Sequence, residues 1–366
     1  MPCSRSILLS AKSAQRSLSR DARSGRRSQS DRRLYRRTSL CYSRCMKRMA
    51  EMRSGRAASP RLSETIESRE NRWLKRFRAG LSGERAGERA GEPLRGRDSF
   101  QLQGEIAGVE GARLVEAALR SGVEILAVLF SESGARHIGR LGPWIPTEAR
   151  LLRTTDRLFA SASGTETPQG IAALVRPRVG TFDDLISGIP LVLVLAGVQD
   201  PGNVGTLVRT AEAFGASGIA ACAAGAIGTA NPFAPKALRA SAGSALRLPI
   251  VRGISVPVLL AQLRIAGVRV YAGCPEDVAD SGSGDGARKP LAPWEIDWRA
   301  PAALLVGNEG AGLPADVVHS ADAIVQIPHA PHANAAHQED SRSESLNAAV
   351  AGSILLYEAA RQRGLG

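Results

Sequence analysis

The stretch LVLVLAGVQDPGNVGTLVRTAEAFGA, residues 191–216, decides the fold. Its first eight residues form a short, continuous apolar run, which is typical of a strand buried on both faces of a parallel sheet. Asp200-Pro201-Gly202 then indicates a turn, and Asn203 is expected to cap a helix over 203–214. Arg209 lies about one and a half turns into that helix. The stretch therefore predicts one strand–loop–helix unit of an α/β sheet.

The same alternation continues to the C-terminus. Strands are expected at 218–222, around 248–251, and at 268–273, 302–307 and 323–328, with helices at 234–243, 255–266, 314–320 and about 345–362. Residues 279–290 (ADSGSGDGARKP) indicate an exposed loop. Short apolar strands separated by helices predict a parallel sheet with both faces covered. Ligands of such sheets bind beyond the carboxyl ends of the strands.

A smaller α/β region is predicted upstream. A helix is expected from the period of Ile66, Trp73, Leu74, Phe77 and Leu81, with start signals at Ser63 and Glu67. A polar linker at 82–98, a strand-like FQLQGEIAGV, a helix at 111–121 and a strand at 124–130 follow, and alternating elements continue to about 175. Residues 176–190 hold two prolines and two glycines and indicate a connector. The predicted domains are thus 61–178 and 188–366, behind a disordered tail at 1–60.

That tail holds the whole net charge. It has 16 Lys and Arg against 3 Asp and Glu, which equals the net charge of +13 for all 366 residues, so the body is neutral. Its Arg- and Ser-rich composition buries too little apolar surface to fold. Three interpretations stay open for this tail, and in particular for residues 1–48. The tail is an upstream start-site artefact with Met46, Met49 or Met52 as the true start, an RNA-binding arm, or a transit peptide.

Cysteine usage and hydropathy exclude several classes. Cys3, Cys41 and Cys45 lie in the tail, and Cys222 and Cys274 stand singly, so no disulfide framework is implied and a cytoplasmic location is expected. Cys41 and Cys45 lack a second ligand pair, so no metal site is expected. No apolar run approaches the roughly 18–20 residues that cross a bilayer, so no membrane association is expected either.

Three predicted strands end in segments suited to a bound small molecule. They run into QDPGNVGTLVRTAEAFGA, GNEGAGLP and PHAPHANAAHQEDSRSESLNAAVAG. In the second, glycines surround the acid Glu309; in the third, Ser345 is the expected N-cap of the final helix, with Asn347 two residues on. Taken alone, Arg209 would be a solvated helical arginine, Glu309 a surface acid and Ser345 a simple cap. No GxGxxG at a helix start, GxxxxGK[ST] or GxSxG occurs, so dinucleotide, P-loop and hydrolase sites have no support.

Together, GVQDPGNVGTLVRTAEAFGA, LLVGNEGAGLP and IPH…ESLNAAVAGSILLYEAAR resemble the three motifs of the SpoU (TrmH-like) family of RNA ribose 2′-O-methyltransferases, within the SPOUT superfamily. They occur in the family's order and at similar separations. Residues 64–175, with EGARLVEAAL and TETPQGIAALV, are similar to that family's N-terminal, L30e-like substrate-binding domain.

The resemblance implies a C-terminal trefoil knot, a homodimer through the knot region, and bound S-adenosylmethionine. By motif match it assigns the catalytic polar residues Asn203, Arg209, Glu309, Ser345 and Asn347. The same match assigns six residues to the cofactor: Gly307, Asn308, Gly310, Ile327, Pro328 and Leu346.

The chemistry agrees with that assignment. Methyl transfer from a sulfonium to a ribose 2′-hydroxyl needs positioning and removal of a proton, but no metal. Arg209 is implied to bind the phosphate beside the target ribose and to help draw the proton away, a role in which its charge matters more than any basicity. Asn203 and Glu309 are expected to orient Arg209 and the ribose, while Ser345 and Asn347 shape the end of the site.

The chain departs from the family pattern between Pro328 and Ser345. The link is about ten residues longer than usual, begins with His329 where Met is common, and also holds His332 and His337. A solvent loop is favoured there over a metal site, and a lid or an RNA contact stays open. The resemblance places Ile327 against the adenine of the cofactor, and the extra length of the link argues against that placement.

The upstream region offers an RNA-binding cluster. Arg69, Arg72, Lys75 and Arg76, with Arg78 nearby, accompany Trp73 and Phe77, a mixture that suits an RNA backbone as well as it suits the solvated face of an amphipathic helix.

The leading hypothesis is an S-adenosylmethionine-dependent 2′-O-methyltransferase of structured RNA, with 23S-type rRNA favoured over tRNA. The alternatives are a tRNA ribose methyltransferase, base methylation, and a non-catalytic RNA-binding or ribosome-assembly protein.

Overall fold

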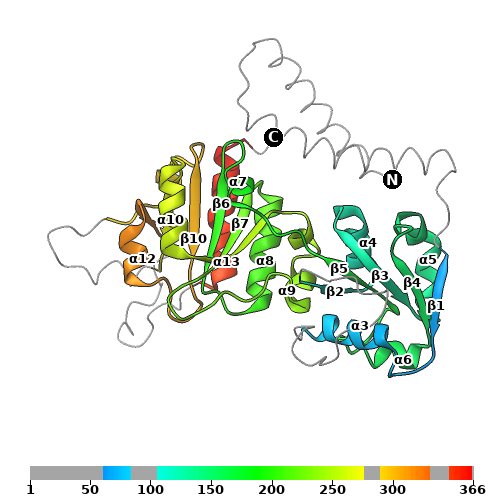
Figure 1. Cartoon of the computed structure of the whole chain (residues 1–366). Coiled ribbons are helices and arrows are strands. Elements are labelled where there is room, and N and C mark those ends of the chain that lie inside the picture. The colour runs from blue at the N-terminus through cyan, green and yellow to red at the C-terminus, as the bar shows by residue number, and fades with distance from the viewer. Residues whose placement is uncertain (1–60, 84–104, 276–288, 330–345, 365–366) are drawn as a thin grey trace, which may run out of the picture. The chain divides into compact units, whose positions relative to one another are not determined.

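The computed structural model describes residues 61–83, 105–275, 289–329 and 346–364, all within one compact unit, Ala58–Gly366. The predicted tail at 1–60 and most of the loop at 279–290 lie outside these ranges. The described residues form two sheets with helices packed on them (Figure 1). Among the described residues there is no helix long and apolar enough to span a bilayer.

The C-terminal sheet has six strands, and every pair of neighbours is parallel. The strand order is β11-β9-β10-β6-β7-β8. The strands are β6 (Leu191–Ala196), β7 (Gly218–Ala223), β8 (Ile250–Ser255), β9 (Arg269–Gly273), β10 (Ala302–Val306) and β11 (Ala323–Val325). β6 lies between β10 and β7 and is buried along its whole length. This arrangement confirms the parallel sheet predicted from its apolar run.

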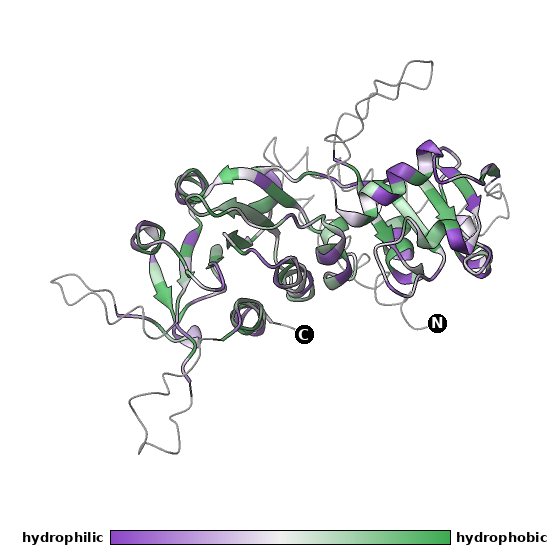
Figure 2. Ribbon diagram, turned by 90° about the horizontal axis from the view of Figure 1, so that it is seen from below, coloured by the Kyte–Doolittle hydropathy of each residue, from purple (hydrophilic) through white to green (hydrophobic). Residues whose placement is uncertain are grey.

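Helices cover both faces of this sheet, because alternate side chains of each strand point to opposite sides. Leu191, Leu193 and Leu195 pack in one core with residues of α8 (Pro201–Ala213), α9 (Pro235–Ala240), η2 (Ser244–Leu246) and α13 (Ala348–Gln362). Val192 and Val194 pack in another core with residues of α7 (Phe182–Leu185), α10 (Val256–Ile265) and α12 (Ala315–Ser320). Figure 2 shows the strands of this sheet mostly in hydrophobic colours and the helices around them in a mixture of hydrophobic and hydrophilic colours.

The N-terminal sheet is mixed, with strand order β1-β4-β3-β5-β2. Its strands are β1 (Leu62–Ile66), β2 (Ala107–Glu110), β3 (Glu124–Phe130), β4 (Arg150–Thr154) and β5 (Ile171–Arg176), and β5 pairs antiparallel with both β3 and β2. Its helices are α3 (Arg72–Ser82), α4 (Ala112–Ser121), α5 (Ala135–Leu141), η1 (Gly142–Trp144) and α6 (Asp156–Ala160). The predicted strand at 124–130 and helix at 111–121 are confirmed.

The helix expected to begin at Ser63 is wrong. Residues Leu62–Ile66 form β1, which pairs with β4 through partners such as Ile66 and Thr154. The helix α3 begins only after Asn71, whose side-chain Oδ1 accepts from the Trp73 amide at 2.8 Å. Tertiary pairing with a strand far along the chain thus overrides the local helical period.

Two helix starts near the predicted site also differ from expectation. Asp200, and not Asn203, caps α8, and Pro201 is the first helical residue. Asn347, and not Ser345, caps α13, because its side chain accepts from the amides of Ala349 and Val350. Proline is favoured at the first position of a helix, so Asp200-Pro201 is a stronger start signal than the turn we expected.

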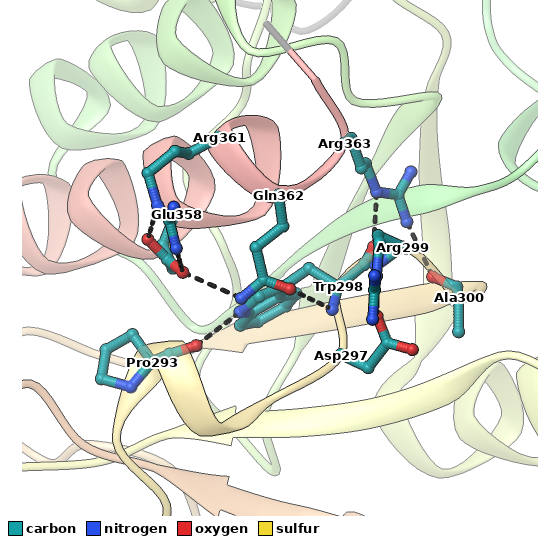
Figure 3. Close-up of polar contacts among 9 residues, drawn as sticks. All are labelled: Pro293, Asp297, Trp298, Arg299, Ala300, Glu358, Arg361, Gln362 and Arg363. Carbon is teal, nitrogen blue, oxygen red and sulfur yellow. Dashed lines mark hydrogen bonds and ion pairs between the residues drawn. The ribbon is translucent and has the colours of Figure 1, made fainter.

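The C-terminal end of α13 is fixed to the main chain (Figure 3). The Arg363 guanidinium donates to four carbonyl oxygens, those of Trp298, Ile189, Pro190 and Ala300, at 2.6–2.9 Å. Gln362 accepts from the Trp298 amide at 3.1 Å, and the buried Trp298 indole donates to the Pro293 carbonyl, in η3 (Pro293–Glu295), at 2.8 Å. We call this group, Arg363, Gln362, Trp298 and their partners, the latch. It ties α13 to the segments that lead into β6 and β10.

The predicted connector at 176–190 contains α7 and a bridge from Val179 to Ile250. The domain boundaries at 178 and 188 stay predictions.

Candidate active site

Three chain segments that are far apart in sequence meet beyond the carboxyl ends of β6 and β10. The Asn203 side-chain Nδ2 donates to Glu309 Oε1 at 3.0 Å, and the Asn347 Nδ2 donates to Asn203 Oδ1 at 3.3 Å. Asn203 lies in the first turn of α8, Glu309 in the loop after β10, and Asn347 at the start of α13. The structure therefore brings together three of the five predicted catalytic residues.

Glu309 is the centre of this network. Its carboxylate also accepts from the backbone amides of Gln199 and Asp200, each at 3.1 Å. Burial opposes its ionisation, but the hydrogen bonds from Asn203 and from the two amides outweigh burial and hold the pKa of Glu309 below its usual value. Glu309 thus ties the loop after β10 to the loop after β6 as a carboxylate.

Asn308 completes this tie. Its Nδ2 donates to the Gly197 carbonyl at 2.9 Å and to Gln199 Oε1 at 3.3 Å, while its Oδ1 accepts from the amides of Gly310 and Ala311. Every polar atom of this side chain is used inside the protein. We expected Asn308 to hold the cofactor, but its side chain positions the loop instead.

The loop from 307 to 312 is closed tightly on itself. Asn308 and Gly312 exchange two backbone hydrogen bonds, at 2.9 and 3.0 Å. A Cβ on Gly307 would lie 2.5 Å from the Gly312 carbonyl carbon, so only glycine fits there. On the open side of the loop, a Cβ at Gly312 would meet nothing within 4 Å. The side of the loop at Gly312 is therefore open, while the backbone groups of Asn308 and Gly312 are bonded to each other.

Arg209 stands apart from the network. It is exposed on α8, six residues beyond Asn203, which places it about 120° around the helix axis from that residue. Both polar atoms of the Asn203 side chain are bonded to Glu309 and Asn347. Our expectation that Asn203 and Glu309 orient Arg209 is therefore not met among the described residues, because the two side chains bond to each other.

The remaining predicted site residues are only partly described. Ile327 follows β11 and packs against the main core, Pro328 is exposed, and Leu346 is 37% exposed beside Asn347. Ser345, His332 and His337 lie outside the described residues. No group of three or more His, Cys, Asp or Glu in the described ranges is arranged to hold a metal ion.

The predicted RNA-binding cluster lies on and beside α3. Lys75 pairs with Glu70 at 2.6 Å, and Arg76 stacks over the Trp73 ring at 5.0 Å. Burial, and then the charge of Arg72, lower the pKa of the Arg76 guanidinium. Arg69 is exposed just before the helix, but Phe77 is fully buried and cannot stack on a base.

Sequence reasoning missed Asp200 and Lys236. Asp200 Oδ1 accepts from the Gly202 amide at the start of α8 and from Lys236 Nζ, the first at 3.1 Å and the second at 2.6 Å. The hydrogen bond from Lys236, together with that from Gly202, lowers the pKa of Asp200. The Asp-Pro pair was the available signal for the cap; nothing local indicated Lys236, 36 residues away.

Comparison with solved structures shows the same architecture. An rRNA methyltransferase from Sinorhizobium meliloti with bound AdoMet superposes with a TM-score of 0.61 at 28% identity, covering 82% of this chain and 98% of that one. The parallel sheet, with its polar network beyond the ends of β6 and β10, has the architecture of a methyltransferase of the SPOUT type.

Sequence comparisons give the family. The model of the SpoU rRNA Methylase family matches residues 190–357, and that of the MRM3-like substrate binding domain matches residues 103–173. The 23S rRNA (guanosine(2553)-2′-O)-methyltransferase RlmP of Bacillus subtilis is 32% identical over 67% of this chain and 84% of its own length. An uncharacterized tRNA/rRNA methyltransferase of Synechocystis is 37% identical over 56% of this chain, which spans 65% of that relative. The chain belongs to the SpoU rRNA methylase family, whose methyl donor is S-adenosylmethionine.

Proposed function

We propose that this chain methylates a ribose 2′-hydroxyl of structured RNA, with 23S-type rRNA as its substrate rather than tRNA. The network that joins Asn203, Glu309 and Asn347 carries the proposal, because it assembles the three motif segments into one site. The name of the Bacillus relative supports the choice of rRNA and of the ribose.

The residues present fit S-adenosylmethionine. Gly307, Asn308 and Gly310 would form one wall of its site, since the loop is open on the side where Gly312 lies, and Ile327, Pro328 and Leu346 would line it. When bound, this cofactor supplies a sulfonium methyl group that needs no metal for its transfer.

Arg209 would act on the RNA. Its exposed guanidinium can bind the phosphate beside the target ribose with two donors and stabilise negative charge on the 2′-oxygen as the proton leaves. Its proposed role is electrostatic, because an arginine stays protonated in proteins. Asn203, Glu309 and Asn347 would hold the loops around the ribose, and Ser345 would complete the end of the site.

The basic residues of α3 would bind the RNA backbone further from the reaction. Arg69, Arg72, Lys75 and Arg76 stand on or next to one helix, where a phosphate backbone can replace the Glu70 carboxylate as the partner of Lys75. The match of residues 103–173 to a substrate-binding domain supports this role for the N-terminal sheet.

A homodimer would cover the apolar groove between α8 and α13. The groove has a volume of about 360 Å³ and is lined by Thr206, Phe214, Ala349, Val350, Ser353, Ile354 and Tyr357. Val350, Ile354 and Tyr357 are 39–51% exposed, which is unusual for three large apolar side chains on one helix. Arg209 lies one turn beyond Thr206 on α8, so the second subunit would lie beside it.

The oligomeric state tests this part of the proposal. Ile354→Asp with Tyr357→Asp should convert a dimer to a monomer in light scattering, because two charges cannot be desolvated in an apolar contact. Val258→Asp, on the exposed face of α10, is the matched control. A wild-type monomer at micromolar concentration would remove the proposal.

A trefoil knot and a cytoplasmic location complete the proposal. The knot would involve the segment between β11 and α13, part of which, 330–345, lies outside the described residues. Both described cysteines, Cys222 and Cys274, are free, in keeping with a reducing compartment.

Transfer of tritium from labelled S-adenosylmethionine to an unmodified 23S rRNA transcript tests the reaction. Label on a 2′-O-methyl nucleoside after nuclease digestion is expected, and Asn203→Ala should lose most of it while retaining its fold. Label on a base, or equal label on a tRNA transcript, would contradict the proposal, and so would an Asn203→Ala enzyme as active as wild type. Absence of transfer to any RNA would favour a binding protein.

A further inference from the structure

A second set of cations lies between the candidate active site and α3. Lys236 and Arg239 are exposed and three residues apart, on the same side of α9. Lys236 reaches Asp200 at the start of α8, the helix that carries Asn203 and Arg209. No hydrogen bond or ion pair joins the Arg239 guanidinium to another described residue. The surface of α9 therefore carries an uncompensated charge one helix away from the proposed reaction.

The loop at 161–165 connects this surface to α3. Arg78, on α3, donates from Nε to the Ser161 carbonyl at 3.2 Å, which leaves its Nη groups at the surface. The loop is held by the buried carboxylate of Glu110, which accepts from Ser163 Oγ at 2.5 Å, Gly164 N at 3.0 Å and Thr165 Oγ1 at 2.8 Å. A buried charge with three donors fixes a loop firmly.

Gly164 lets the loop lie between the two helices. A Cβ at this position would stand 2.5 Å from the Leu81 carbonyl oxygen of α3 and 3.9 Å from Arg239 Nη1. The absence of a side chain thus allows the loop to approach α3 closely, beside the exposed Arg239 guanidinium. The end of α3 also contacts α9 directly, with a Cβ at Gly83 only 3.2 Å from Pro235 Cδ.

We infer that Arg239, with Arg78, binds the phosphate backbone of the RNA as it passes from the active site to the basic helix α3. The inference rests on the proposed function, which supplies an RNA at both ends of this path. The acidic groups on or beside these segments are the exposed loop residue Glu166, the buried Glu110 that holds the loop, the Lys236 partner Asp200, and Glu70, whose pKa is lowered by the hydrogen bond and charge of Lys75 and then by the charge of Arg78. Two arginine forks held at fixed places suit the bidentate recognition of phosphates.

Filter binding of the unmodified 23S rRNA transcript to the full chain tests the inference. Arg239→Gln should weaken binding about 3–10-fold in 0.1 M salt and reduce the slope of log K against log salt by about 0.7–0.9, the value for one lost phosphate contact. Arg78→Gln should do the same, and the double variant should reduce the slope by about twice as much. Arg150→Gln is the matched control, because Arg150 is exposed at the start of β4, whereas α3 packs on β2 and β5.

Equal affinities and salt slopes for Arg239→Gln and Arg150→Gln would overturn the inference. If the wild type methylates the transcript and this result is found, the inference fails alone. If the wild type transfers no methyl group but Arg239→Gln still lowers the salt slope, the proposed function fails alone. Unchanged thermal unfolding of Arg239→Gln, read by circular dichroism, separates a lost contact from a lost fold.

Discussion

The two ends of α13 differ in what their polar residues bind. At the start, Asn347 bonds to the side chain of Asn203, and Glu309 beside them is exposed. At the other end, Arg363 bonds only to backbone carbonyls, and burial lowers the pKa of its guanidinium. A main-chain latch leaves nothing for a ligand, whereas an exposed network of side chains can exchange partners. The end at Arg363 is therefore suited to stability, and the end at Asn347 to the proposed chemistry.

Arg209→Ala, on α8 and outside the network at the start of α13, should give the largest effect on the proposed chemistry. If Arg209 stabilises the reacting oxygen as proposed, loss of its charge should lower kcat about 10²–10³-fold, because such donors act chiefly in the transition state. The exposed side chain contributes little to folding, so the thermal midpoint and the Kd for S-adenosylmethionine should stay within error. Single-turnover transfer to 23S rRNA measures this. Activity within threefold of wild type would remove Arg209 from the mechanism.

Arg363→Ala should give the next largest effect, and at the opposite end. Four carbonyl oxygens would lose a charged donor, which should cost about 2–4 kcal/mol of unfolding free energy. Arg363→Lys should recover only part of the loss, because an ammonium cannot reproduce the planar fork. Urea unfolding measures both. Arg361→Ala, which removes the pair between the exposed Arg361 and the largely covered Glu358, is the control and should cost about 1 kcal/mol or less, since Glu358 keeps its hydrogen bond from Gln362.

An Arg363→Ala protein as stable as wild type would contradict the stabilising role of the latch. If that protein were also inactive, the separation between the two ends of α13 would fail as well. The second result would mean that the latch acts on the site through α13.

The sequence predicted the features that depend on neighbouring residues, but not the contacts between residues far apart in the chain. The parallel sheet was predictable, since the buried run at 191–196 reports its own surroundings. The three motifs pointed to Asn203, Glu309 and Asn347, but the bond between Asn203 and Glu309 spans 106 residues, and local patterns do not encode which side chains meet. The sequence did not predict the latch, because Arg363 binds backbone carbonyl groups, which every residue has.

Local errors had local causes. Ser345 and Asn203 were expected as caps because both residue types favour that position, yet Asn347 and Asp200 compete for it and have the better neighbours. Phe77 was expected beside RNA, but on α3 it falls on the same face as Leu74 and Leu81, which face the core.

Glu309→Gln should have a smaller effect on activity and on stability than the two arginine variants. The amide keeps one acceptor oxygen but must place its NH₂ group against the donors of Gln199 or Asn203, so the loops should shift. We expect kcat/KM to fall about tenfold, with a loss of stability below 1.5 kcal/mol. Steady-state transfer and urea unfolding measure the two quantities. Asp316→Asn, on the first turn of α12, is the control acid.

The smallest effect is the pH dependence of that stability difference. The pKa of Glu309 is lowered in the folded protein, so between the folded value and the unfolded value near ~4.3 the unfolded chain binds more protons. The contribution of Glu309 to stability is therefore complete above pH ~5 and is lost as the pH falls through its folded pKa. The difference in thermal midpoint between wild type and Glu309→Gln should stay constant from pH 7 to about 5 and shrink below that. A difference that grows on acidification would mean that Glu309 is protonated in the folded site, and the carboxylate tie between the two loops would have to be abandoned.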